Sequence, residues 1–154
     1  MSFVRTVLGD IPPESLGTCL SHEHLIIDPS YVTQLSPDLR LPSVENAVRE
    51  LLAVRAAGGR AAVDCMPCDA GRNILKLAEI SRQSGLHVIA ATGLHRTRYY
   101  PEGHWRYRLT PEELATARGL LADEALWLDG RTSAGAQASA VKRNEQLAQD
   151  SEAA

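Results

Sequence analysis

Two histidines separated by one residue, His22 and His24, are the side chains of this sequence best suited to metal chemistry. They lie in a segment, residues 17–27, that is rich in small and β-favouring residues and is bounded by a glycine and an Asp-Pro pair, which predicts a buried strand. Residues i and i+2 of a strand project from the same face, about 6.6 Å apart. Two imidazoles placed in this way can bind one metal ion, with Zn–N distances of about 2.0–2.1 Å. A histidine pair at a strand edge without any metal is the alternative interpretation, since this spacing also arises by chance.

Further polar and aromatic side chains follow the next two expected strands, over residues 60–65 and 86–92. Asp64 lies at the end of the first, where it would either hydrogen-bond a ligand histidine or cap the following loop. The second leads into a loop of about fifteen residues, 93–108, which is long for a structural connection. Its basic and aromatic side chains would either line a substrate pocket or clamp the loop to the fold. The candidate substrate-loop residues are His95, Tyr99, Tyr100, His104 and Trp105.

Cys65 and Cys68 form a C-x-x-C sequence after the second expected strand. Such a pair is compatible with a redox site or with half of a zinc site. No second cysteine pair follows it, so a chance spacing in a loop is the favoured interpretation. The three cysteines are an odd number without framework spacing, which argues against structural disulfides.

Helical patterns alternate with these strands. Residues 4–16 are expected to form a small hairpin or an extended arm. Helices are expected to begin after Ser43, after Asn73 or Asp69, and after Thr110, with glycines ending the first two. Strands that alternate with helices predict an α/β fold with a parallel sheet, either doubly wound or a barrel.

Composition excludes several classes of function. The chain has 154 residues, of which 44% are hydrophobic, and a formal charge of −3. That charge argues against binding to nucleic acid or to an anionic membrane, because both need a basic surface. We find no apolar run of the roughly 18 residues that a membrane helix needs and no signal-peptide pattern, so a cytoplasmic location is expected. Residues 1–129 are expected to be the folded part, and residues 130–154 a polar tail that is loosely helical or disordered.

Several motifs in the same order resemble the N-terminal part of the phosphotriesterase family of the amidohydrolase superfamily. The resemblance covers roughly residues 4–115. It rests on Thr6-Val7-Leu8-Gly9, on residues 16–25 with their His-Glu-His, on Val63-Asp64-Cys65-Met66-Pro67 with Gly71-Arg72-Asn73, on residues 84–93, and on the aromatic segment 99–105. Several motifs in one order are far more specific than the histidine pair alone.

The resemblance implies a TIM-type (βα)8 barrel with a binuclear metal centre, in which His22 and His24 would hold a divalent ion such as Zn²⁺. The family's other ligands are a bridging carboxylated lysine or glutamate, two histidines and an aspartate on later strands. A barrel needs about 250 residues, and all five histidines lie at or before position 104. The chain is therefore expected to be an incomplete barrel of about three βα units. Lys142 is interpreted as a solvated lysine rather than the bridging one.

The function implied by the resemblance is metal-dependent hydrolysis of ester-like bonds in a small phosphotriester, lactone or carboxylic ester. A chain with only half of the metal site would be a truncated form, and no catalytic residue is assigned. The alternatives are a non-catalytic truncated product or a subunit that depends on a partner, such as a second copy or a missing C-terminal half. A C-x-x-C redox or zinc module is the least favoured alternative.

Overall fold

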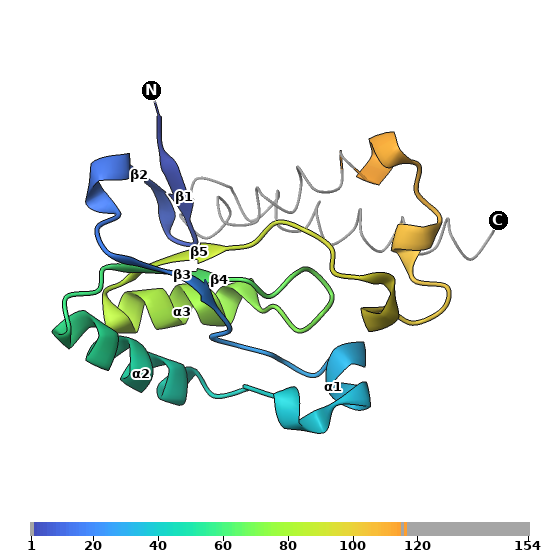
Figure 1. The fold of residues 1–154 in the computed structure, drawn as a ribbon, viewed down its shortest axis with the longest axis horizontal. Helices are drawn as coiled ribbons and strands as arrows, with labels where there is room; N and C mark the ends of the chain where they lie inside the picture. Colours follow the sequence, from blue (N-terminus) through green and yellow to red (C-terminus); the bar gives the residue numbers. More distant parts are fainter. Residues whose placement is uncertain (1, 115, 117–154) are drawn as a thin grey trace, which may run out of the picture.

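The computed structural model describes residues 2–114 and 116 of the chain (Figure 1). The first element is the expected hairpin, formed by antiparallel strands β1 (Val4–Thr6) and β2 (Gly9–Ile11) and followed by the 3-10 helix η1 (Pro13–Ser15). Its turn lies at residues 7–8. Val7 is fully buried and its N–H donates to the carbonyl of Val88 at 2.8 Å, which fastens the hairpin to the third strand of the main sheet.

The main sheet has three parallel strands in the order β3-β4-β5. They are β3 (Cys19–Glu23), β4 (Ala61–Asp64) and β5 (His87–Ala90). The prediction of an α/β fold with a parallel sheet is confirmed. Because neighbouring strands run in the same direction, their carboxyl ends meet at one edge, where this class of fold places its chemistry.

The two long helices begin and end where the sequence indicated. Helix α2 (Val44–Ala56) has Ser43 as N-cap, and α3 (Ile74–Ser84) has Asn73 rather than Asp69. Gly85 ends α3 with φ +69°, a left-handed conformation that glycine adopts without a steric penalty. Both helices lie on the same side of the sheet (Figure 1).

The core fills the space between these helices and the sheet. Ala62 and Val88 lie at paired positions of β4 and β5 and pack with α2 and α3, whose main contributions are Leu51, Leu77 and Ile80. Val63 and Ile89 alternate with them along the strands and are only half-buried. Among the described elements, α2 and α3 cover one face of the sheet, and the side chains of Val63 and Ile89 on the other face are half-buried.

Several short elements stand where only loops were expected. The proline-containing segment after β3 contains α1 (Tyr31–Leu35), which starts with a reciprocal Ser30–Thr33 capping box, and the 3-10 helix η2 (Pro37–Leu39). The long loop after β5 contains η3 (Thr97–Tyr99) and η4 (Trp105–Tyr107). No helix in the described part of the chain is long and apolar enough to cross a membrane.

The helix expected after Thr110 begins as predicted. The Glu113 N–H donates to the Thr110 hydroxyl at 3.2 Å, and the Thr110 N–H donates to the Glu113 carboxylate at 2.8 Å, which is a complete capping box. The expected tail, residues 130–154, and Lys142 lie outside the described residues.

Candidate metal and substrate site

His22 and His24 lie at the carboxyl end of β3. Their rings are 5.5 Å apart between centroids at an interplanar angle of 81°, and both residues are exposed. The strand was expected to continue through residue 27, but it ends at Glu23, so His24 is the first residue after the strand. The spacing of the pair suggested two positions of one regular strand, but only His22 lies within the strand.

A β-bulge in β3 turns the two histidines to the open face of the sheet. Leu20 pairs with Ala62 and Glu23 with Asp64, so Ser21 and His22 together lie opposite the single residue Val63. One extra residue reverses the alternation of side chains beyond it. In a regular strand Leu20 and His22 would share a face. With the bulge, Leu20 packs against the core between sheet and helices, and the register places His22 and His24 on the opposite face.

Asp64, at the end of β4, is fully buried next to the histidine pair. Its carboxylate accepts hydrogen bonds from the Leu25 N–H at 2.8 Å and the Met66 N–H at 2.9 Å. Burial raises the pKa of Asp64, and hydrogen bonds from backbone amides partly oppose this rise. Of the two roles considered for Asp64, the observed contacts are those of a cap, and the cap joins the loops that follow β3 and β4.

One half of the long loop after β5 is clamped to the loop after β4. Asp69 has a positive φ of 57° and accepts a hydrogen bond from the Trp105 indole N–H at 2.6 Å. The His104 Nε2 lies 3.3 Å from the same carboxylate oxygen. Tyr100 is buried, donates its hydroxyl hydrogen to the Cys68 carbonyl at 3.1 Å and accepts the His95 N–H at 2.7 Å. Tyr100, His104 and Trp105 thus contact the neighbouring loop.

The other candidate residues of this loop, His95 and Tyr99, form a second group of contacts. Tyr99 packs against a buried cluster that includes Ile27 and Val32 of the segment that follows His24. The His95 ring stacks on the Tyr99 ring at 4.1 Å with an interplanar angle of 2°. Burial lowers the pKa of His95, and the positive charges of nearby arginines and of His24 lower it further.

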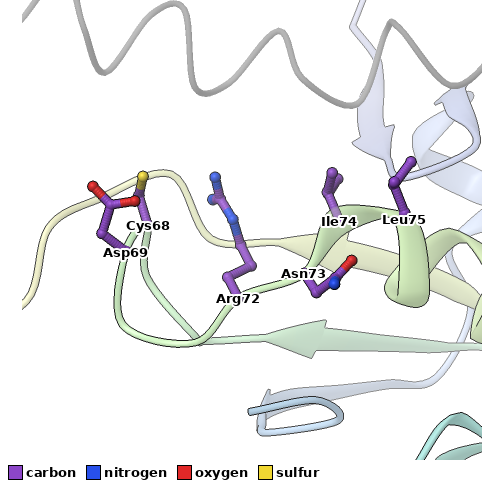
Figure 2. A pocket seen from close by; sticks show the side chains of 6 residues that line it. All are labelled: Cys68, Asp69, Arg72, Asn73, Ile74 and Leu75. Carbon is purple, nitrogen blue, oxygen red and sulfur yellow. The ribbon is translucent and has the colours of Figure 1, made fainter. Parts of the chain in front are cut away.

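A pocket of about 270 Å³ lies beside the amino end of α3 (Figure 2). Cys68, Asp69, Arg72, Asn73, Ile74 and Leu75 line it. Two of its polar groups already serve the fold, since Arg72 donates to the Ala91 carbonyl and Asn73 caps α3. Its lining contains neither His22 nor His24, so it is separate from the candidate metal site.

The described residues provide two metal donors at this site but not a complete ligand set. Among residues 2–114 and 116, no group of three or more His, Cys, Asp or Glu side chains could hold a metal ion. The exposed, neighbouring imidazoles of His22 and His24 fit a divalent ion as two of its ligands, whereas protein zinc sites use three or four.

The two cysteines of the C-x-x-C sequence lie in the loop after β4. Cys65 and Cys68 are free thiols. Burial raises the pKa of Cys65, with smaller effects from its surroundings, which disfavours the thiolate that redox chemistry uses.

Sequence reasoning missed two features of this site. No residue pattern around Ser21 indicates the bulge, because Leu20, His22 and His24 have the spacing of residues on one face of a regular strand. Asp69 was considered only as a helix cap, whereas its carboxylate binds the loop after β5. Its position in the turn after a strand marked it as polar and exposed, but its partner lies 36 residues away.

Comparison with known proteins identifies the fold and the family. The chain matches the phosphotriesterase family over residues 2–124. It is 34% identical over 100 residues to a phospho-furanose lactonase of Mycoplasmopsis agalactiae, a match that spans 64% of this chain and 28% of that protein. Two solved structures resemble it. An amidohydrolase of Mycoplasma synoviae has a TM-score of 0.70, 32% identity and coverage of 74% of this chain and 33% of its own.

The second structure is a lactonase of Listeria monocytogenes, with a TM-score of 0.60, 33% identity and coverage of 72% of this chain and 32% of its own. The chain thus spans about a third of the length of these relatives. The parallel sheet with helices on one face is consistent with part of a TIM barrel. The match to the family covers most of the sequence, and the chain belongs to the phosphotriesterase family.

Proposed function

We propose that this chain supplies the first-strand part of the active site of a metal-dependent hydrolase that cleaves ester-like bonds. The observation that carries the proposal is the placement of His22 and His24, whose rings lie 5.5 Å apart on the open face of the sheet at its carboxyl edge. This edge is where enzymes built on parallel α/β barrels place their catalytic residues.

The pair would hold one divalent ion, such as Zn²⁺, together with donors beyond those in the described residues. A bound divalent ion makes a water molecule more acidic and polarises a carbonyl or phosphoryl oxygen. The chain's own contribution is to orient its two imidazoles. The bulge sets the face from which they project, and the Asp64 cap holds the backbone that follows them.

The substrate we favour is a small lactone or related ester that carries an anionic group. The relatives include proteins named as lactonases, one of them a phospho-furanose lactonase. The loop over residues 93–108 contains four arginines and a single acidic residue, Glu102. Arg96 and Arg98 are exposed beside His95, where their charge would attract a phosphate or carboxylate group.

A second candidate is a subunit that acts only with a partner, either a second copy or a chain carrying further ligands. Its support is that the described residues hold no group of three metal-ligating side chains. Lactone and phosphotriester hydrolysis by the purified 154-residue chain, with and without added zinc, tests whether the active site needs such a partner. We expect no turnover from the chain alone, and robust zinc-dependent hydrolysis would favour an active site completed within this polypeptide.

Zinc calorimetry tests the metal assignment directly. We expect weak binding by the wild-type chain, because two ligands fall short of a usual site, and loss of that binding in the double variant His22→Ala, His24→Ala. His87→Ala is the matched control, since His87 lies at the start of β5, away from the carboxyl edge. Undiminished binding in the double variant would refute the assignment.

A further inference from the structure

The backbone on both sides of His24 is anchored to β4. The carbonyl of Glu23, just before His24, accepts the Cys65 N–H at 2.8 Å. The N–H of Leu25, just after it, donates to the Asp64 carboxylate at 2.8 Å. The first bond continues the sheet ladder and needs no particular side chain. The second exists only because an acidic side chain stands at position 64.

Asp64 is itself held rigidly. It is fully buried, its own backbone carbonyl accepts the Ala91 N–H at 2.9 Å, and its second carboxylate oxygen accepts the Met66 N–H at 2.9 Å. A carboxylate with both oxygens engaged and no exposed surface has little freedom to move. The position of the Leu25 amide is thereby tied to the centre of the sheet, since β4 is its middle strand.

The hydrogen bond from the Leu25 N–H to Asp64 holds the backbone just beyond the end of β3. The ladder between β3 and β4 is interrupted by the bulge before Glu23, and β3 ends at that residue. His24 would otherwise be the first residue of an exposed loop. Backbone hydrogen bonds to a buried carboxylate replace the missing ladder bonds.

We propose that Asp64 is a positioning residue for His24: by capping the Leu25 amide it holds the His24 imidazole beside that of His22. Asp64 touches neither the metal nor the substrate in this role and acts through the backbone. The expected effect on metal binding rests on the proposed function. The positioning role itself does not, because the geometry of the two rings can be measured without a metal.

The test compares Asp64→Asn with the wild-type chain. The variant keeps the shape of the side chain, but its NH₂ group would face one of the two backbone N–H donors. We expect the nuclear Overhauser contacts between the His22 and His24 rings to weaken or vanish, and the Leu25 amide to exchange with solvent at least tenfold faster. Zinc affinity should fall by about 10-fold or more, the usual effect of residues that orient metal ligands.

Ser81→Ala is the matched control. It removes a buried side-chain hydrogen bond, from the Ser81 hydroxyl to the Leu86 carbonyl at 2.6 Å, away from the histidines. We expect this variant to lose stability while it keeps the ring contacts and the zinc affinity of the wild type. Loss of zinc affinity in Ser81→Ala to the same degree would show that general destabilisation, not positioning, accounts for the effect.

Three further outcomes have a defined meaning. Unchanged ring contacts and unchanged Leu25 exchange in folded Asp64→Asn would overturn the inference. If that variant does not fold, exchange in the wild type decides, because a Leu25 amide that exchanges as fast as a free amide excludes the cap. If the wild type shows the ring contacts and slow exchange but binds no zinc through His22 and His24, the proposed function fails while the positioning role stands.

Discussion

Two carboxylates flank the segment that follows the histidine pair, and their surroundings shift their pKa values in opposite directions. Burial raises the pKa of Asp64 by more than the hydrogen bonds from backbone amides lower it. Burial also acts to raise the pKa of Asp28, but hydrogen bonds from Lys76 and Asn73 and the charge of Lys76 outweigh it, so that this pKa is lowered. Asp28 thereby joins the segment after β3 to the start of α3.

The Asp28 contacts predict an acid-sensitive part of the stability. A carboxyl group whose pKa is lowered by folding stabilises the protein at pH values above its ordinary pKa of 3.8. This contribution is lost as the pH falls through the pKa of the folded state, which lies below 3.8. Asp28→Asn should therefore lower the free energy of unfolding at pH 7 and have a much smaller effect near pH 2. Denaturant titrations across that range measure both.

Asp38→Asn serves as the control, because Asp38 is exposed on η2 and should tolerate the change. A deficit in Asp28→Asn that is equal at pH 7 and pH 2 would contradict the assignment.

At the scale of elements, the bulge lets one strand serve two purposes. Leu20 faces the helices and completes the core, whereas His22, only two residues later, faces the opposite side. A regular strand cannot do both, because side chains two apart share a face. The surplus residue before Glu23 is what separates the core-forming part of β3 from the part that carries the histidines.

This geometry predicts that deletion of Ser21 is tolerated. Without Ser21 the ladder becomes regular, Leu20 stays opposite Ala62, and His22 takes the position opposite Val63, on the same open face as before. We expect the deletion variant to fold and to keep its zinc affinity within a few-fold. Deletion of Glu23 should abolish binding, because the two histidines would become adjacent and point to opposite faces.

Zinc calorimetry and circular dichroism distinguish these cases. A folded Ser21 deletion variant that has lost zinc binding would show that the bulge itself, rather than the face it selects, orients the histidines.

The buried hydroxyl of Tyr100 joins the loop after β5 to the loop after β4. In Tyr100→Phe, the His95 N–H loses a part-buried hydrogen bond and the Cys68 carbonyl loses a buried one. We expect a loss of about 1–3 kcal/mol in the free energy of unfolding. In Tyr107→Phe, by contrast, the lost bond to the Thr97 carbonyl is exposed, and the change should stay within about 0.5 kcal/mol.

Urea titration of the two variants measures the difference. Equal effects in both would mean that the Tyr100 hydroxyl does not hold the two loops together.

At the scale of the whole molecule, the described part of the sheet is covered on one side only. Helices α2 and α3 lie on one face (Figure 1), and Val63 and Ile89 are half-buried on the other. Within the described residues, β3 pairs in the parallel sheet with β4 alone, whereas the outer edge of β5 accepts the Val7 N–H at the Val88 carbonyl. Open strand edges and apolar surface favour association with another chain.

We therefore expect the purified chain to be oligomeric or prone to aggregation. Light scattering over a range of concentrations should show a mass above that of one chain, and Ile89→Lys, which charges the open face, should reduce it. Leu75→Lys is the control, because Leu75 is 65% exposed on α3 rather than on the sheet. A wild-type chain that stays monomeric at high concentration would contradict this expectation.

Much of the fold was predictable because its signals are local. Ser43, Asn73, Gly85 and Thr110 act on amides and carbonyls within a few residues of themselves, so the caps they form depend little on distant parts of the chain. The alternation of strands and helices indicated the parallel sheet for the same reason. The short helix α1 was not predicted, because its five residues between prolines are too few to show a helical pattern.

For the candidate site, the sequence by itself determined the residue types and their place at the ends of strands, including the pair His22 and His24. Only the tertiary structure decided which face the pair occupies and what holds it there. The register of β3 depends on pairing with β4 some forty residues away, and the cap on Leu25 joins residues 39 apart. Such contacts follow from the packing of the whole sheet, which no local pattern of residue types records.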